Sequence, residues 1–183
     1  MIKQFENRKL FQCALGQFVF EFAELEFSLL YFWGLIDTPK NQNASIRENI
    51  GTDFEDRRKK VTGFIHNHLP DLKTRWDKIN TKLSSINLER RYLIHGIGQA
   101  RFYEDSITAV IKHKGELKVK KFTVTDIKKL SDKIAHLLTG KDGLAGEFLI
   151  DFTMHRFNHY NKQTSDGKII YKVNDKILTD YKG

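Results

Sequence analysis

The residues best suited to chemistry lie together at positions 89–96, which read Glu-Arg-Arg-Tyr-Leu-Ile-His-Gly. Arg90 can make a bidentate contact with a phosphate or a carboxylate. His95 can accept or donate a proton near neutral pH. Together they could bind an anion and transfer a proton beside it. The alternative is structural, because a histidine next to Gly96 more often caps a helix end than catalyses a reaction.

Arg90 occupies an apolar position of a predicted helix. Apolar residues recur there at helical spacing, at Leu72, Trp76, Ile79, Leu83 and Ile86. The next position of this stripe is Arg90, and a guanidinium there needs a carboxylate, a carbonyl or a bound anion. Glu26 similarly leaves the polar stripe of an earlier predicted helix and joins its apolar side. A structural ion pair between Glu26 and Arg90 and a catalytic role both fit this pattern.

His95 is expected at the carboxyl end of the same helix. Gly96 suits the left-handed conformation just past a helix end. The negative end of the helix dipole favours imidazolium at His95, whereas Arg90 disfavours it if the two are near. Arg90 and His95 lie about 140° apart around the helix axis, so only their long side chains could converge on one groove.

Residues 89–96 resemble the R-x4–6-H motif of the HEPN superfamily, commonly seen as E-R-N-x-x-x-H-G. The resemblance extends over roughly the first 140 residues, through a long first helix with an internal Glu, a helix ending at His-Gly, a hairpin, and a helix opening with Thr. It implies a helical bundle, frequent homodimerisation through the motif-bearing helices, and endoribonuclease activity without metal or other cofactor. One departure is Arg91, where the family often has Asn, Asp or His.

Under this resemblance Arg90 and His95 take the catalytic motif positions, with Glu26, Arg91 and Tyr92 in support. The implied reaction activates the RNA 2′-hydroxyl to attack the adjacent phosphate, which leaves a 2′,3′-cyclic phosphate. His95 would act as general acid or base and Arg90 would stabilise phosphorane charge. Two copies facing across a dimer would make one composite groove. Such an enzyme would fit a toxin or defence effector, with an antitoxin or another protein as a further partner.

Two other functions remain open. Arg91 in place of the usual small polar residue favours a non-catalytic HEPN-like module that binds RNA or a protein. Alternatively, Glu26 and Arg90 specify the packing of a purely structural helical dimer.

The charge of the chain is compatible with RNA as a partner. Lys and Arg number 31 against 23 Asp and Glu, which gives a net charge of +8. Five lysines cluster on the predicted hairpin, at Lys112, Lys114, Lys118, Lys120 and Lys121. Contact with an RNA backbone is the functional interpretation, and a solvated face is the alternative.

Other constellations are weaker. Cys13 is the only cysteine, which excludes an intrachain disulfide; its apolar neighbours predict a buried thiol. A reducing cytoplasmic compartment is therefore expected. His155 and His159 share a helix face, but no third ligand is evident, so no metal site is predicted. No membrane-spanning segment is predicted either, because Gln and Glu interrupt the first apolar run.

The elements that must position these residues make a mainly α chain with a small antiparallel hairpin or three-stranded meander after the motif helix. Helices are predicted over 5–36, 53–68, from Pro70 to Gly96, from Thr123 or Thr125 to Leu138, and over 144–158. Residues 37–51 are predicted as a loop with one helical turn, and strands over 99–104, 107–113 and 117–122. One domain over 1–160 is expected, with its β insertion near 97–122. Residues 161–183 form a tail that is either a short hairpin or loosely held.

Overall fold

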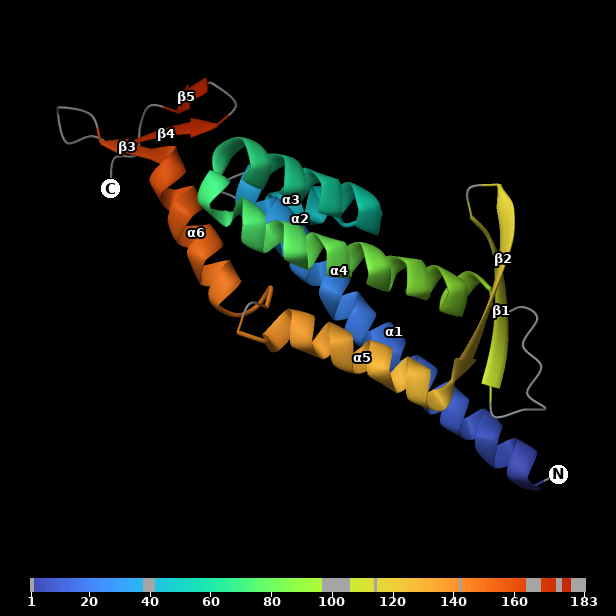
Figure 1. The fold of residues 1–183 in the computed structure, drawn as a ribbon. Helices are drawn as coiled ribbons and strands as arrows, with labels where there is room; N and C mark the ends of the chain where they lie inside the picture. Colours follow the sequence, from blue (N-terminus) through green and yellow to red (C-terminus); the bar gives the residue numbers. More distant parts are fainter. Residues whose placement is uncertain are drawn as a thin grey trace. The chain divides into compact units, whose positions relative to one another are not determined.

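The fold is mainly helical with a small antiparallel hairpin, as predicted (Figure 1). The computed structural model describes residues 2–37, 42–96, 106–113, 115–141, 143–163, 169–173 and 176–178. The helices are α1 (Ile2–Asp37), α2 (Gln42–Asn49), α3 (Phe54–His68), α4 (Pro70–His95), α5 (Val124–Thr139) and α6 (Glu147–Tyr160). The strands are β1 (Ser106–His113), β2 (Glu116–Thr123), β3 (Asn161–Gln163), β4 (Ile169–Val173) and β5 (Lys176–Leu178).

The chain divides into two compact units, and α1 and α4 each continue from one unit into the other. Unit 1 comprises Met1–Leu25 and Thr81–Leu138, and unit 2 comprises Glu26–Asn80 and Thr139–Gly183. Unit 1 therefore holds the end of α4, the hairpin and α5. Since the motif residues 89–96 all belong to unit 1, this unit carries the candidate site.

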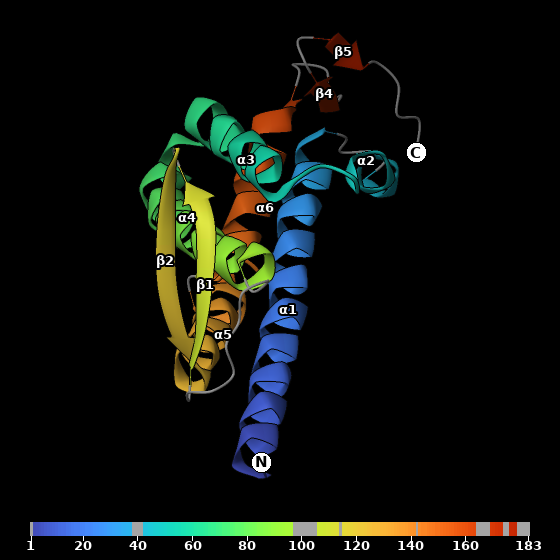
Figure 2. The ribbon, with the colours of Figure 1, turned by 90° about the vertical axis from the view of Figure 1, so that its right-hand side faces the viewer.

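The hairpin of unit 1 has one apolar face because side chains alternate along its two strands. β1 and β2 pair antiparallel from Ser106 opposite Thr123 to His113 opposite Glu116. Gly115 lies in the turn with φ 86°, a conformation that favours glycine. The buried face consists of Ile107, Ala109, Ile111 and Phe122. Figure 2 shows the hairpin beside the last turns of α4, and α5 following directly from β2.

Unit 2 is held by an aromatic core. Phe32 of α1 contacts Phe152 of α6 edge to face, with ring centroids 4.8 Å apart. Trp76 of α4 stacks on Phe148 of α6 at 5.8 Å, and its indole N–H donates to the Thr62 hydroxyl of α3 over 3.0 Å. The buried tryptophan therefore has the hydrogen-bond partner that such a group requires. β3, β4 and β5 form a separate antiparallel sheet in the order β3-β4-β5.

Helix boundaries follow local sequence signals. The Asp53 side chain accepts a hydrogen bond from the Asp56 amide over 2.8 Å, which caps the start of α3. Pro70 then opens α4, a position where its missing amide hydrogen costs nothing. These signals place the helix that carries the motif in the predicted range.

Several predicted details were wrong. Residues 42–49 form the two-turn helix α2 rather than a loop with one turn. Gly96 does not adopt a left-handed φ; it is required for a different reason, described below. Cys13 is exposed, because it lies on the opposite side of α1 from the buried Phe11 and Phe18. In the described part of the tail, β4 pairs antiparallel with both β3 and β5, so that the predicted short hairpin is present with one strand added. The strand predicted over 99–104 lies outside the described residues, as does Lys114.

Candidate functional site

Arg90 lies in the middle of the apolar side of α4. Leu83, Ile86 and Leu93, which share that side, are 0%, 3% and 0% exposed. The guanidinium carbon of Arg90 is 4.9 Å from the centroid of the Phe22 ring of α1. Arg90 itself is half-buried. A planar cation over an aromatic face is attracted by the ring quadrupole, so Phe22 orients the motif arginine.

His95 occupies a different environment. It is the last residue of α4 and its side chain is exposed. It follows Arg90 at a spacing that corresponds to about 140° around the helix axis. Arg91 lies one turn before His95 and is half-buried, at about 40° from it on the helix surface. Within one copy of the chain, His95 therefore lies closer to Arg91 than to Arg90 around the helix axis.

Glu89 connects the motif helix to the hairpin. The ammonium of Lys120 on β2 donates a hydrogen bond to the Glu89 carboxylate. The same ammonium lies 5.9 Å from the Tyr92 ring and 5.2 Å from the Phe122 ring. Tyr92 is 6% exposed, so its ring belongs to the packing between α4 and the hairpin. Tyr92 and Lys120 thus hold the hairpin next to the motif.

Gly96 determines how closely the hairpin approaches the end of α4. A Cβ at this position would lie 2.6 Å from the Tyr92 carbonyl oxygen and 3.0 Å from both the Val110 nitrogen and the Ala109 Cβ. The Gly96 amide donates to that same Tyr92 carbonyl over 2.9 Å. Gly96 also accepts a hydrogen bond from the Val110 amide over 3.4 Å. A glycine is therefore needed here because of close approach and not because of its φ.

The hairpin lysines are divided between its two faces. The register pairs Lys112 with Leu117, Val110 with Val119, and Thr108 with Lys121 on the outward face. Lys112 and Lys121 are exposed, and Leu117 and Val119 are 75% and 67% exposed. This outward face therefore combines two ammonium groups with exposed apolar side chains. We call the side chains of Lys112, Leu117, Val119 and Lys121 the outer hairpin face.

The other two lysines lie on the opposite face of β2. Lys120 is engaged with Glu89, as described above, and Lys118 is exposed. Among the hairpin lysines, Lys120 thus contributes to the contact between the hairpin and α4.

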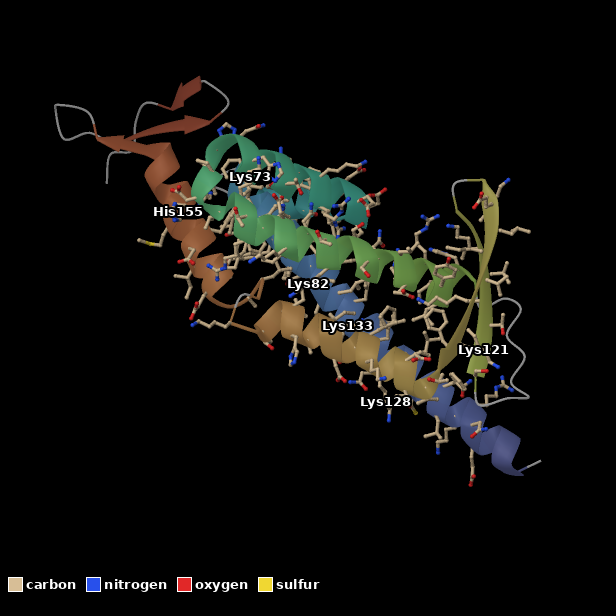
Figure 3. All side chains as sticks on the ribbon, in the orientation of Figure 1. Lys73, Lys82, Lys121, Lys128, Lys133 and His155 are labelled. Carbon is tan, nitrogen blue, oxygen red and sulfur yellow. The ribbon has the colours of Figure 1, made fainter. Side chains whose placement is uncertain are left out.

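Positive charge continues from the hairpin into α5. Residues 81–138 contain twelve Lys or Arg against six Asp or Glu, and thus carry most of the excess of the whole chain. Lys128, Lys129 and Lys133 are exposed on α5, whose opposite side is buried through Ile127, Leu130 and Ile134. Figure 3 labels Lys121 on the hairpin and Lys128 and Lys133 on α5. Such an excess of one sign attracts polyanions.

The start of α5 is fixed by a reciprocal cap. Asp126 accepts from the Thr123 amide over 2.9 Å and from its hydroxyl over 2.7 Å, while the Asp126 amide donates to the Thr123 hydroxyl oxygen over 3.1 Å. These hydrogen bonds, from the Thr123 amide first and then from its hydroxyl, hold the pKa of Asp126 below its usual value. The cap therefore fixes where β2 ends and the basic side of α5 begins.

Glu26 belongs to unit 2, and its side chain is half-buried. Its carbonyl oxygen accepts a hydrogen bond from Arg57 over 3.2 Å. Because Arg90 belongs to unit 1, the pairing of Glu26 with Arg90 stays a prediction.

Two histidines outside the motif lie close to a carboxylate. His66 Nε2 lies 2.7 Å from the Asp77 carboxylate, and His155 Nδ1 lies 3.8 Å from that of Asp71. In the part of the chain that the structure describes, no group of three or more His, Cys, Asp or Glu side chains is arranged to hold a metal ion. None of the described helices is long and apolar enough to span a membrane.

Three features of this region were not predicted from the sequence: the contact of Phe22 with Arg90, the pairing of Glu89 with Lys120, and the steric requirement for glycine at position 96. Glu89 had a usable signal, since it directly precedes Arg90 and lies one turn before Tyr92 on the same helix side. Phe22 had none, because any aromatic residue on the apolar side of α1 could have met the arginine.

No family model, no curated protein and no solved structure matches this chain.

Proposed function

We propose that this chain is a HEPN-type endoribonuclease that cleaves RNA by attack of the 2′-hydroxyl on the adjacent phosphate. The observation that carries the proposal is the placement of the motif: His95 is exposed at the end of α4, and Arg90 is held earlier on the same helix by the Phe22 ring. An exposed imidazole can reach a bound polynucleotide, and a half-buried guanidinium has restricted freedom and can be pre-oriented toward phosphate.

In this proposal the roles follow from the chemistry of each group. His95 exchanges the proton between the 2′-hydroxyl and the leaving oxygen. Arg90 stabilises the charge that develops on the phosphorane, and Arg91, on the side of α4 nearer His95, contacts a neighbouring phosphate. Because Arg90 and His95 lie on different sides of one helix, one cleavage site would combine Arg90 of one copy with His95 of another. The proposal therefore includes a dimer.

The outer hairpin face and the exposed lysines of α5 support RNA as the substrate. Lys112 and Lys121 can neutralise phosphates, while Leu117 and Val119 offer apolar surface to unpaired bases. We expect the double variant Lys112→Gln/Lys121→Gln to bind single-stranded RNA more weakly and to lower the salt dependence of binding by about 1.4 in slope, since each neutralised phosphate contributes about 0.7. The matched control is Lys59→Gln in unit 2, whose side chain is 70% exposed.

Cleavage itself is tested with a fluorescently labelled, unstructured RNA in the presence of EDTA. We expect the wild type to cut the RNA and His95→Ala to lose at least about a hundredfold in rate, the usual contribution of a general acid or base. The control is His136→Ala, an exposed histidine of α5. Equal cleavage by His95→Ala and wild type would remove the assignment of His95.

The second candidate is a non-catalytic module of the same kind that binds RNA without cutting it. Arg91 favours this alternative, since the family that the motif resembles often has Asn, Asp or His at that position. Here RNA would bind with a steep salt dependence and remain intact. Intact RNA after prolonged incubation with a binding-competent wild type would select this function.

A further inference from the structure

The two edges of the β1–β2 hairpin differ. The Val110 amide of β1 donates to the Gly96 carbonyl over 3.4 Å, so the end of α4 occupies this edge. In an antiparallel pair, residues directly opposite each other turn their amides and carbonyls either both toward the partner strand or both away from it. Val110 turns away from β2 and lies opposite Val119. The amide and carbonyl of Val119 therefore point away from β1, toward the other edge of the hairpin.

The same orientation recurs at every second residue of β2. The Thr123 amide donates to the Asp126 carboxylate over 2.9 Å, outside the hairpin, which agrees with this alternation. Leu117 shares the orientation of Val119, since it lies two residues before it. Neither of these two backbones makes a hydrogen bond to another described element. We call the outward amides and carbonyls of Leu117 and Val119 the open edge of β2.

The surroundings of this open edge are exposed. Residues 116–119 are exposed on both faces of the strand, and the side chains of Leu117 and Val119 are 75% and 67% exposed. On β1, by contrast, Ser106 and Ala109 are buried. In Figure 2, β1 lies nearer the last turn of α4 than β2 does. A row of outward amides and carbonyls on an exposed strand can pair with a further strand.

The charge of β2 determines which strand fits. The strand carries Lys118, Lys120 and Lys121 against the single acidic residue Glu116. In an antiparallel pair of two copies with Val119 opposite Val119, Lys118 of each copy would lie opposite Lys120 of the other. Like charges directly opposite each other are destabilising, and lysines on an edge strand commonly prevent such pairing between copies. An acidic strand would instead meet opposite charges.

We propose that the open edge of β2 binds an extended segment of a partner protein in which apolar and acidic residues alternate. The segment adds to the hairpin as an antiparallel third strand. Its apolar side chains lie beside Leu117 and Val119, and its acidic side chains lie beside Lys118 on the other face. Backbone hydrogen bonds supply affinity in such strand addition, and alternate side chains supply specificity. RNA lacks the alternating amides and carbonyls that this pairing requires, so the inference does not depend on the proposed ribonuclease activity.

The proposal is tested with a fluorescent synthetic peptide of four Glu-Val repeats, titrated into the full chain and followed by anisotropy. We expect saturable binding. The peptide valines would face Leu117 and Val119 and turn their amides toward β2, whereas the peptide glutamates would turn theirs away. Methylating the valine amide nitrogens should therefore weaken binding at least about tenfold, because the donors to β2 are lost. Methylating the glutamate amide nitrogens is the matched control and should change binding by less than about threefold.

Two variants of Val119 test the same edge from the side of the protein. Val119→Pro removes an outward amide that the hairpin does not use, as is tolerated on an edge strand, and should weaken peptide binding at least about fivefold. Val119→Thr keeps the amide and should stay within about twofold of the wild type. Circular dichroism checks that both variants are folded; if Val119→Pro is not, the two methylated peptides still decide the question.

Hydrogen exchange of the Leu117 and Val119 amides separates strand addition from binding through side chains alone. We expect the peptide to slow the exchange of both amides in the wild-type protein by at least about tenfold. Absence of peptide binding, equal binding of the two methylated peptides, or unchanged exchange of these amides overturns the proposal. Protection of both amides by a single-stranded RNA, with no effect of the peptide, would assign the edge to RNA and also overturn it.

Discussion

Lys120 of β2 donates a hydrogen bond to Glu89 of α4, the residue immediately before the motif arginine. Glu89 is 17% exposed in its side chain, and its Oε2 is buried with no hydrogen-bond partner among the described atoms. The carboxylate thus depends on Lys120 for compensation of its charge. We infer that this pair, with the Tyr92 and Phe122 rings beneath the ammonium, positions the hairpin against the motif helix.

Removing the ammonium should therefore destabilise unit 1. We expect Lys120→Met to lower the free energy of unfolding by about 1–3 kcal/mol, because a largely buried carboxylate is left unpaired. Urea denaturation measures this loss. Lys118→Met is the control, since Lys118 lies on the same strand and is exposed. Adding Glu89→Gln to Lys120→Met should recover part of the loss; a double variant less stable than Lys120→Met alone would contradict the pairing.

Replacing Gly96 by alanine should be costly for a steric reason. The new Cβ would meet the Tyr92 carbonyl at 2.6 Å, so the end of α4 or the hairpin must shift. We expect Gly96→Ala to cost about 1–3 kcal/mol of unfolding free energy, as overpacked sites do. Gly63→Ala in α3 should instead stabilise the protein by about 0.5–1 kcal/mol, because the space that its new Cβ would occupy is open, with nothing within 4 Å. Thermal unfolding measures the change in stability for each variant. Equal changes for Gly96→Ala and Gly63→Ala would argue against the close approach of the hairpin to Gly96.

The cap between Thr123 and Asp126 predicts a pH dependence of stability. Because hydrogen bonds lower the pKa of Asp126 in the folded protein, its contribution is present above the unfolded-state value near 3.8. That contribution is lost as the pH falls through the lowered folded-state pKa. We expect Thr123→Ala to cost about 1 kcal/mol at neutral pH. The difference in unfolding free energy between this variant and the wild type should shrink in acid, and a difference independent of pH would contradict this account.

Arg57 should be a large contributor to the stability of unit 2. It is 7% exposed and donates to the Glu26 carbonyl over 3.2 Å and the Ile50 carbonyl over 2.7 Å. A third donor, its Nε, contacts the Thr52 hydroxyl over 3.2 Å. We expect Arg57→Met to cost about 2–4 kcal/mol, because the buried Arg57 side chain makes three hydrogen bonds that methionine cannot make. Lys59→Met, at an exposed position of the same helix, should change the free energy of unfolding by less than about 0.5 kcal/mol. A similar cost for both variants in urea denaturation would contradict this role.

Local patterns were sufficient to predict most of the fold. The apolar spacing from Leu72 to Ile86 and the boundaries at Pro70 and Gly96 predicted α4, and the alternation in 107–113 and 117–122 predicted β1 and β2. α2 was missed because its sequence is polar and short, so its helical period carries little hydrophobic signal. The exposure of Cys13 was missed because α1 is apolar on more than one side, and composition does not say which side is covered.

The candidate site was less predictable, since it depends on contacts between residues far apart in the sequence. The position of Arg90 on the apolar side of α4 followed from helical spacing, but its contact with Phe22 did not. Five hairpin lysines looked equivalent in the sequence. The register separates Lys112 and Lys121 on the outer hairpin face from Lys120, which contacts Glu89. Which face of a two-stranded sheet is covered is decided by the helices that pack on it and not by the strands themselves.

The chemistry of RNA cleavage tests the central claim most directly. An RNA oligonucleotide that the wild type cuts at one position is compared, in EDTA, with the same oligonucleotide carrying a single 2′-deoxy substitution at that position. We predict that the all-RNA substrate yields a 2′,3′-cyclic phosphate and that the substituted oligonucleotide is not cut there, because the attacking hydroxyl is missing. Cleavage of the substituted oligonucleotide at an unchanged rate, or no cleavage of either by the folded wild type, would contradict the account.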